Sequence, residues 1–259
     1  MPSLAEQRRL RILDELNSAQ NLRVNDLSNR LGVSEVSIRR DLQILETMGM
    51  LKRVHGGAVA TSEHTVGEAL SDRWRQNREK KERIGRAAAA MVQRGDRIII
   101  DSGSTPLQVA KQIAPELITA GNLTMITASL PVVHEVGGNP GIHLILLGGV
   151  YLPAYDLVVG PQTIENMKNL HADKLFLGTD GLTFTHGVTT ANVLEAEVDR
   201  AMVKAAREVI VVSDSSKIGL IGLISIMSLI EIDKLVTDTD ASDDFVEELR
   251  HNGIEVIRV

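Results

Sequence analysis

The chain has 259 residues, a formal net charge of −6 and no cysteine. This length suffices for one small and one medium domain, each with its own core. Disulfides and thiolate metal sites are excluded, and the seven histidines show no metal-ligand spacing, so we predict neither a metal nor a cofactor. Neither an apolar run of about 20 residues nor a signal-peptide core is evident, so we expect a cytoplasmic protein without a membrane partner.

The first 58 residues predict three helices and a hairpin. A first helix carries leucines on one face, namely Leu10, Leu13 and Leu16. A second helix covers residues 24–31 and ends at Gly32, which suits a tight turn between crossed helices. Ser34 caps a third helix, and its apolar positions share one face: Ile38, Leu42, Leu45 and Met48. This order is typical of the helix-turn-helix, whose last helix enters the major groove of DNA.

The outer face of the third helix and the basic hairpin after it supply the candidate DNA contacts. The helix would read base edges or nearby phosphates, and the hairpin would clamp the backbone. The predicted DNA-binding residues are Ser34, Glu35, Ser37, Arg39, Arg40, Lys52, Arg53 and His55. A helical protein-binding domain with surface arginines is the alternative, and the hairpin argues against it.

The distribution of charge favours the first part as the DNA-binding part. Residues 1–60 carry nine basic and seven acidic side chains, a net charge of +2, and the rest of the chain carries −8. A net charge of +2 is modest, so the prediction depends on the concentration of arginine and lysine in the third helix and the hairpin.

A charged segment connects the two parts. Residues 59–85 interleave lysine and arginine with glutamate and aspartate and contain the single tryptophan, Trp74. We interpret this segment as a linker helix with a solvated face. A second DNA-contacting surface is the alternative.

From residue 86 onward, short apolar runs alternate with helical segments. The predicted strands are 97–100, 123–127, 142–147, 174–177, 209–212, 234–236 and 254–257. Continuously apolar strands separated by helices predict an α/β domain with a mostly parallel sheet that is covered on both faces.

Polar loops follow three of these strands, where open α/β sheets bind their ligands. The loop at 101–106 is rich in small and hydroxyl residues and opens a helix, so it suits a phosphate. Asp101 and Asp180 could accept hydrogen bonds from a polyol, and Lys217 adds a positive charge. No P-loop pattern points to ATP or GTP.

The chain resembles the DeoR family of bacterial transcription regulators. The family's N-terminal signature is matched by residues 33–42, by Leu45-Glu46 and by residues 55–58, and residues 76–259 are similar to its sensor domain. The resemblance implies a winged helix-turn-helix over residues 1–58. It also implies an effector-binding domain over residues 86–259, with the fold shared by ribose-phosphate isomerases, glucosamine-phosphate deaminases and CoA transferases.

The resemblance also assigns residues to the effector pocket. In the family an Asp-x-Gly-Ser/Thr-Thr loop is associated with phosphate, and an Asp-x-Ser-Lys segment lines the same pocket. The predicted effector-binding residues are Asp101, Gly103, Ser104, Thr105, Ser129, Asp180, Gly181 and Lys217. Ala128 stands where many members have asparagine, which implies a different contact at that point.

We therefore expect a DNA-binding regulator, a repressor of a carbohydrate-use operon, that a phosphorylated sugar or sugar alcohol releases from its operator. Helix-turn-helix proteins usually read paired half-sites, so we expect a homodimer or homotetramer. The alternative is a sugar-phosphate isomerase or deaminase with an appended helical domain, for which Glu195 would be a further acid or base. A scaffold that binds other proteins, without DNA or ligand, is a third hypothesis.

Overall fold

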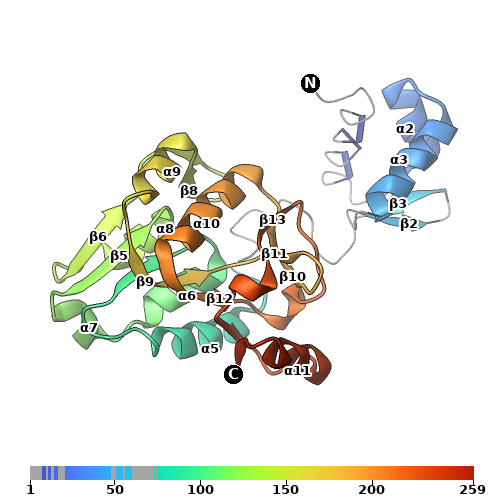
Figure 1. Cartoon of the computed structure of the whole chain (residues 1–259). Helices are drawn as coiled ribbons and strands as arrows, with labels where there is room; N and C mark the ends of the chain where they lie inside the picture. Colours follow the sequence, from blue (N-terminus) through green and yellow to red (C-terminus); the bar gives the residue numbers. More distant parts are fainter. Residues whose placement is uncertain are drawn as a thin grey trace. The chain divides into compact units, whose positions relative to one another are not determined.

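The structure is a computed structural model with two compact units, Met1–Glu68 and Ala69–Val259 (Figure 1). It describes residues 8, 9, 11, 12, 15, 16, 21–47, 51–54, 56–59, 73 and 75–259. The side chains of Asn21, Thr47, Lys52 and Val59 lie outside this description. Each unit is considered by itself below.

The first unit contains the predicted helix-turn-helix and hairpin. The helical residues 8, 9, 11, 12, 15 and 16 precede β1 (Asn21–Arg23), α2 (Val24–Leu31), α3 (Glu35–Thr47), β2 (Lys52–Val54) and β3 (Gly57–Val59). The three strands form an antiparallel sheet in the order β1-β3-β2. Gly32 ends α2 with φ 65°, a left-handed conformation that glycine adopts without strain. The hairpin turns at Gly56, where φ is 82°.

The core of the first unit lies between its helices and the sheet. Ile38, Leu42 and Leu45 are buried on the inner face of α3, as the spacing predicts. The first helix buries Ile12 and Leu16. The predicted core positions Leu10, Leu13 and Met48 lie outside the described residues.

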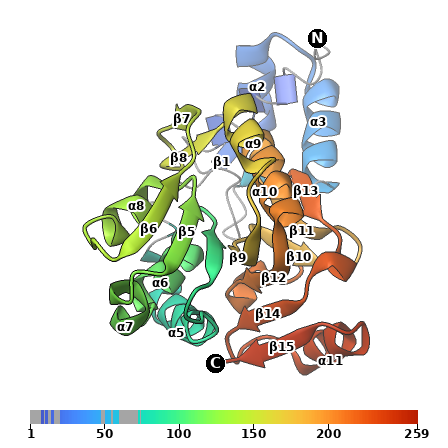
Figure 2. The same cartoon turned by 60° about the vertical axis from the view of Figure 1, so that its left-hand side comes forward.

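The second unit is built on a seven-stranded sheet in the order β15-β14-β12-β9-β4-β5-β6, and all neighbouring strands are parallel. Figure 2 shows the strands from β6 on the left to β15 at the lower right. Their bounds are β4 (Arg97–Ile100), β5 (Leu123–Thr127), β6 (Ile142–Leu146), β9 (Ala172–Leu177), β12 (Ala206–Val212), β14 (Lys234–Thr237) and β15 (Glu255–Arg258). All seven predicted strands are confirmed.

Helices cover both faces of this sheet, so alternate side chains of a strand enter different cores. Ile98 and Ile100 belong to one cluster and Ile99 to the other. The first cluster includes side chains of α5 (Arg78–Ala89), α6 (Ser104–Gln112), α7 (Pro115–Thr119) and α8 (Leu130–Val136). The second includes side chains of α9 (Pro161–Met167), α10 (Val193–Ala205) and α11 (Asp243–His251). Burial on both faces explains why the strands are continuously apolar.

The helix α5 differs from the linker helix predicted over residues 59–85. It begins at Arg78 and continues to Ala89. Ile84 and Ala88 are fully buried in the core of the second unit. The described part of the segment is therefore a packed element of the α/β unit, and its face toward the core is not solvated.

Two small antiparallel sheets accompany the main one, and the sequence analysis did not anticipate them. β10 (Gly181–Thr183), β11 (Gly187–Thr190) and β13 (Ile224–Met227) form one, and β7 (Val150–Leu152) and β8 (Leu157–Val159) form the other. Among the helices that the structure describes, none is long and apolar enough to cross a membrane.

Candidate functional site

The exposed face of α3 is a stripe of four side chains. Val36, Arg39, Arg40 and Gln43 are spaced as i, i+3, i+4 and i+7, and all four are exposed. Val36 is an apolar residue with 76% of its surface exposed, at the helix end that enters the major groove in this motif. The two arginines were predicted as DNA contacts and Val36 and Gln43 were not, although their spacing marks the same face.

The predicted contacts at the start of α3 also hold the helix together. The Ser37 backbone N–H donates to Ser34 Oγ at 3.3 Å, which confirms the predicted cap. Arg39 Nη2 lies 2.9 Å from Glu35 Oε2, an ion pair one helical turn apart. Glu35 therefore orients Arg39 in the structure without DNA.

The hairpin is tied to α3 through Arg53. Its backbone N–H donates to Glu46 Oε1 at 2.9 Å, and its guanidinium donates to the Gln43 side chain. The hairpin and the exposed face of α3 therefore form one continuous surface. The side chain of Lys52, and the whole of His55, lie outside the described residues.

On the opposite side of α3, Asp41 is almost fully buried and paired with the first helix. Its carboxylate lies 2.6 Å from Arg8 Nε and 3.4 Å from Arg9 Nη1. This ion pair joins two helices of the unit, so Asp41 has a structural role despite its place among the exposed arginines of the sequence.

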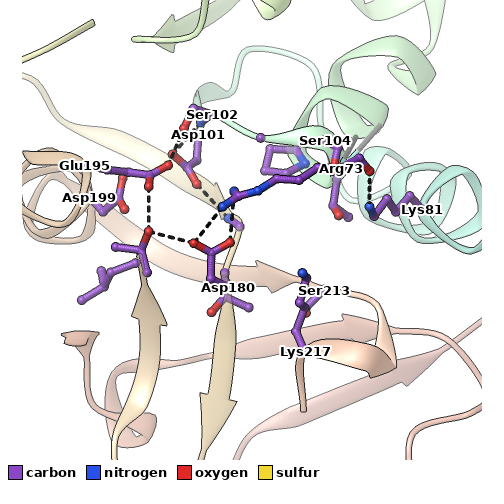
Figure 3. A pocket seen from close by; sticks show the side chains of 17 residues that line it. Arg73, Lys81, Asp101, Ser102, Ser104, Asp180, Glu195, Asp199, Ser213 and Lys217 are labelled. Atoms are coloured by element: carbon purple, nitrogen blue, oxygen red, sulfur yellow. Dashed lines mark hydrogen bonds and ion pairs between the residues drawn. The ribbon is translucent and has the colours of Figure 1, made fainter. Parts of the chain in front are cut away.

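A polar pocket lies in the second unit at the carboxyl ends of β4, β9 and β12, which are neighbours at the centre of the sheet (Figure 3). Six predicted effector residues line it: Asp101, Gly103, Ser104, Thr105, Asp180 and Lys217. The lining residues outside the predicted set include Arg73, Lys81, Ser102, Thr190, Glu195, Asp199 and Ser213.

The loop after β4 forms the side of the pocket for which a phosphate was predicted. Gly103 precedes α6 with φ 108° and ψ 169°, a conformation essentially restricted to glycine. Ser104 and Thr105 start the helix, where the first backbone N–H groups have no intrahelical acceptor. With the helix dipole and two hydroxyls, this end of α6 suits a phosphate group.

Asp101 lines the pocket and also anchors this loop. Its carboxylate accepts hydrogen bonds from the backbone N–H of Ser102 at 2.5 Å and of Gly178 at 2.9 Å. It is also hydrogen-bonded to the Asp199 side chain. Burial raises the pKa of Asp101 to about 6, against the effect of the two N–H donors.

Glu195 of α10 lies next to Asp101 and is also buried. Its two carboxyl oxygens accept hydrogen bonds from Ser102 Oγ at 3.1 Å and from Thr190 Oγ1 at 2.6 Å. Burial, followed by the negative charges of Asp180 and Asp101, raises its pKa to about 7. Burial and the charge of Asp101 likewise raise the pKa of Asp199 well above its ordinary value. Part of this carboxyl cluster therefore carries protons at neutral pH.

Asp180 faces the pocket and is paired with Arg73, which the sequence analysis did not assign to the pocket. Arg73 Nη1 lies 3.0 Å from Asp180 Oδ1, and Nη2 lies 3.1 Å from Oδ2 (Figure 3). Burial alone would lower the pKa of Arg73, but Asp180 and Glu195 outweigh it and raise that pKa. The Tyr155 ring packs against the guanidinium, with 5.7 Å from Cζ to the ring centroid.

The loop after β12 brings Lys217 to the pocket, and α5 holds this loop. Asp214 caps the short 3-10 helix η1 (Ser215–Lys217) and accepts a hydrogen bond from Asn77 Nδ2 at 3.0 Å. Lys81 is also buried at the pocket, and its Nζ donates to the backbone carbonyl of Arg73 at 2.7 Å. The interpretation of this helix as a solvated face is therefore corrected at Lys81.

Two predicted effector residues are not among those that line the pocket. Ser129 precedes α8, and its backbone N–H donates to Thr127 Oγ1 at 3.0 Å. Gly181 belongs to β10, where a Cβ atom would lie 2.3 Å from the backbone oxygen of Leu220. Within the described part of the chain, no group of three or more acidic, histidine or cysteine side chains could hold a metal ion.

A helix-turn-helix unit followed by an α/β unit with a polar pocket defines a class of protein, the one-chain transcription regulators with a sensor domain. Residues 8–64 match the family model for the DeoR-like helix-turn-helix domain, and residues 76–239 match the model for the DeoR C terminal sensor domain. The chain belongs to the DeoR family of transcriptional regulators.

Its relatives match over almost their whole length. The chain is 34% identical to a putative aga operon transcriptional repressor of Escherichia coli O157:H7, over 98% of this chain and 93% of the relative. It is 34% identical to the regulator GolR of Listeria innocua, over 96% of this chain and 97% of GolR. It is 32% identical to the repressor GlcR of Bacillus subtilis, over 97% of this chain and 95% of GlcR. These relatives are regulators, so the isomerase or deaminase alternative is set aside.

Among solved structures, ribose 5-phosphate isomerase A of Methanocaldococcus jannaschii matches 55% of this chain and 55% of its own. The sequence identity is 17% and the TM-score is 0.41.

Proposed function

We propose that this regulator represses a carbohydrate-use operon and that a phosphorylated sugar or sugar alcohol releases it from DNA. The observation that carries the proposal is the pairing of two chemistries in one pocket. The start of α6 suits a phosphate, and the Asp180 carboxylate, at the end of the neighbouring strand, suits the hydroxyls of a polyol.

Repression is supported by the function of two relatives. The Escherichia coli protein is described as a putative operon repressor, and GlcR as a transcriptional repressor. In our proposal residues 1–58 bind the operator and residues 86–259 bind the effector, with α5 packed into the effector-binding part. The protein acts in the cytoplasm, as a homodimer or homotetramer on paired half-sites.

A thermal-shift screen with sugar phosphates, the matching free sugars and inorganic phosphate tests the effector class. A ligand at 100 times its dissociation constant stabilises a fold by about 2.7 kcal/mol. We expect stabilisation by a sugar phosphate and not by the free sugar. An operator duplex, selected by this protein from a random DNA pool, should then be released by the same compound in a fluorescence-anisotropy titration. Free sugars that act as well as phosphates would contradict the proposal.

A further inference from the structure

Arg73 lies close to the end of the first unit in the sequence and also lines the pocket. It follows the end of the first unit, Glu68, by only a few residues and precedes α5. Its side chain is only 14% exposed and reaches across the pocket to Asp180 (Figure 3). The chain that leaves the DNA-binding unit therefore places a cation inside the effector pocket.

The Arg73 guanidinium is bound to the Asp180 carboxylate, which is the group that would accept hydrogen bonds from a polyol. Both oxygens of Asp180 accept from Arg73, at 3.0 and 3.1 Å, and Oδ2 also accepts from the Ala191 backbone N–H at 3.0 Å. An arginine that binds a carboxylate in a bidentate way donates one N–H hydrogen bond to each carboxylate oxygen. The hydroxyls of an effector at Asp180 would have to replace these two donors.

The backbone of Arg73 is fixed at the same place. Its carbonyl accepts a hydrogen bond from Lys81 Nζ, and Lys81 is itself buried in the helix that packs into the core. The Tyr155 ring adds a contact to the guanidinium. The connecting segment, which is the chain between Glu68 and α5, is therefore held to the pocket at Arg73 by side-chain and backbone contacts together.

We propose that Arg73 is an internal occupant of the pocket and the link between the pocket and the DNA-binding unit. Without effector, the pair with Asp180 holds the connecting segment in the state that binds the operator. An effector replaces Arg73 at Asp180, and the released segment no longer supports that state. This inference deepens the proposed function and rests on it. The coupling runs along the chain itself, through a change in the population of two states.

The decisive measurement is operator binding without any ligand. Arg73→Met keeps a long side chain and removes the charge, so it should imitate the effector and weaken operator binding by about 5–150-fold, the usual range of allosteric coupling. Asp180→Asn weakens the same pair from the other side and should act in the same direction. Arg75→Met, at an exposed position two residues away, is the matched control and should bind like the parent. Thermal unfolding of each variant reports whether it is folded.

Operator binding by folded Arg73→Met at the parent's affinity would overturn the inference, whatever the ligand is. Because Asp180→Asn acts on the same pair through the other partner, it keeps the test decisive if Arg73→Met does not fold. An unchanged affinity for this variant would likewise count against the link.

Ligand binding shows whether Arg73 competes with the effector for the pocket or contacts the bound effector. Calorimetric titration with glycerol 3-phosphate, glucose 6-phosphate and inorganic phosphate serves as the probe. If Arg73 competes with the effector, Arg73→Met should bind the active sugar phosphate about tenfold more tightly, because the site no longer has to be vacated. Weaker binding would make Arg73 a ligand contact and would overturn the inference. If no phosphate compound binds the parent, the proposed effector class fails, while the operator measurement still decides the role of Arg73.

Discussion

At the scale of single residues, the pocket combines charged groups that sequence position alone does not bring together. Arg73 and Asp180 are 107 residues apart in the chain and form a direct pair. Arg73 and Lys81 lie in a run where basic and acidic side chains alternate, a pattern that is usually a solvated surface. Asp180 and Lys217 could be predicted, since polar residues directly after apolar strands stand at the ligand-binding edge of a parallel sheet.

The buried carboxyl of Glu195 makes stability depend on pH. Its pKa is about 7 in the folded protein and 4.5 in its ordinary state, so between these values the folded protein holds more protons than the unfolded chain. The free energy of unfolding should therefore fall as pH rises from about 4.5 to about 7. In Glu195→Gln this fall should be smaller by about 1–3 kcal/mol.

Urea unfolding at pH 5, 6, 7 and 8 measures this difference. Asp101 and Asp199 also have raised pKa values, so a slope of the same sign should remain in the variant. Glu247→Gln changes an exposed carboxyl of α11 and serves as the control. Parallel pH profiles for the parent and Glu195→Gln would show that Glu195 does not titrate in this range.

The anion-binding residues should control effector sensitivity and leave DNA binding intact. Lys217→Ala removes a positive charge from the pocket, and Thr105→Val removes a hydroxyl while it keeps the shape. Loss of a charge-assisted hydrogen bond costs about 1.5–3 kcal/mol, which moves the midpoint of operator release by roughly one to two decades. Anisotropy of labelled operator, titrated with the active sugar phosphate, gives the midpoint. If both variants fold and keep the parent's midpoint, Lys217 and Thr105 do not contact the phosphate.

Substitutions of Arg39 or Arg40 and of Lys52 should have different effects on DNA binding. If Arg39 or Arg40 reads a base, its replacement by Ala should cost about 1–3 kcal/mol at the preferred site and relax sequence discrimination there. Lys52→Ala should weaken binding to all sequences alike and lower the salt slope by about one, as expected for a phosphate contact. Binding to specific and random duplexes across a salt series checks both expectations. If all three variants bind DNA like the parent, the predicted DNA-binding face is wrong.

At the scale of elements, α5 is packed closely against α6 beside the pocket. Gly85 lies where α5 meets α6, and a Cβ atom there would come within 2.5 Å of Gln108 Cβ and 2.6 Å of its backbone carbon. Both helices carry pocket residues, Lys81 on one and Thr105 on the other. The glycine thus permits the approach that brings these two residues to the same site.

Gly85→Ala should therefore destabilise the protein, although alanine favours a helix over glycine by about 1 kcal/mol. Overpacking at the helix contact costs about 1–3 kcal/mol, and the overlap involves backbone atoms that cannot rotate away. Thermal unfolding measures the effect. Gly138→Ala, at a position with open space around it, is the control. A melting temperature for Gly85→Ala at or above the parent's would contradict the close packing.

The elements differ in how well the sequence predicts them. The seven strands of the main sheet could be predicted because burial on both faces demands continuous apolar runs. β10, β11 and β7 have only three or four residues each and contain glycine, threonine or tyrosine, so they carry no such run. β10 begins directly after Asp180 and β11 ends at Thr190, so this side of the pocket was predicted less completely than the side formed by the loop after β4.

At the scale of the whole molecule, two units with different chemistry share one chain. The family models match both, so the order of DNA-binding part and sensor part is that of the DeoR regulators. The order could be predicted from the helix-turn-helix signature and from the change to alternating strands and helices. The boundary was predicted less well, because the charges of residues 59–85 resemble a linker while part of the segment is packed in the core.

The anchoring role of Asp101 bears on which effectors the pocket can distinguish. One carboxylate accepts hydrogen bonds from the loop that starts α6 and from the loop that leads to Asp180. Asp101 thus fixes the distance between the proposed phosphate site and the proposed hydroxyl site at Asp180. An effector that fits the proposed function is then selected by the number of carbon atoms between its phosphate and the hydroxyl that reaches Asp180, so a homologous series of polyol phosphates should show one preferred chain length.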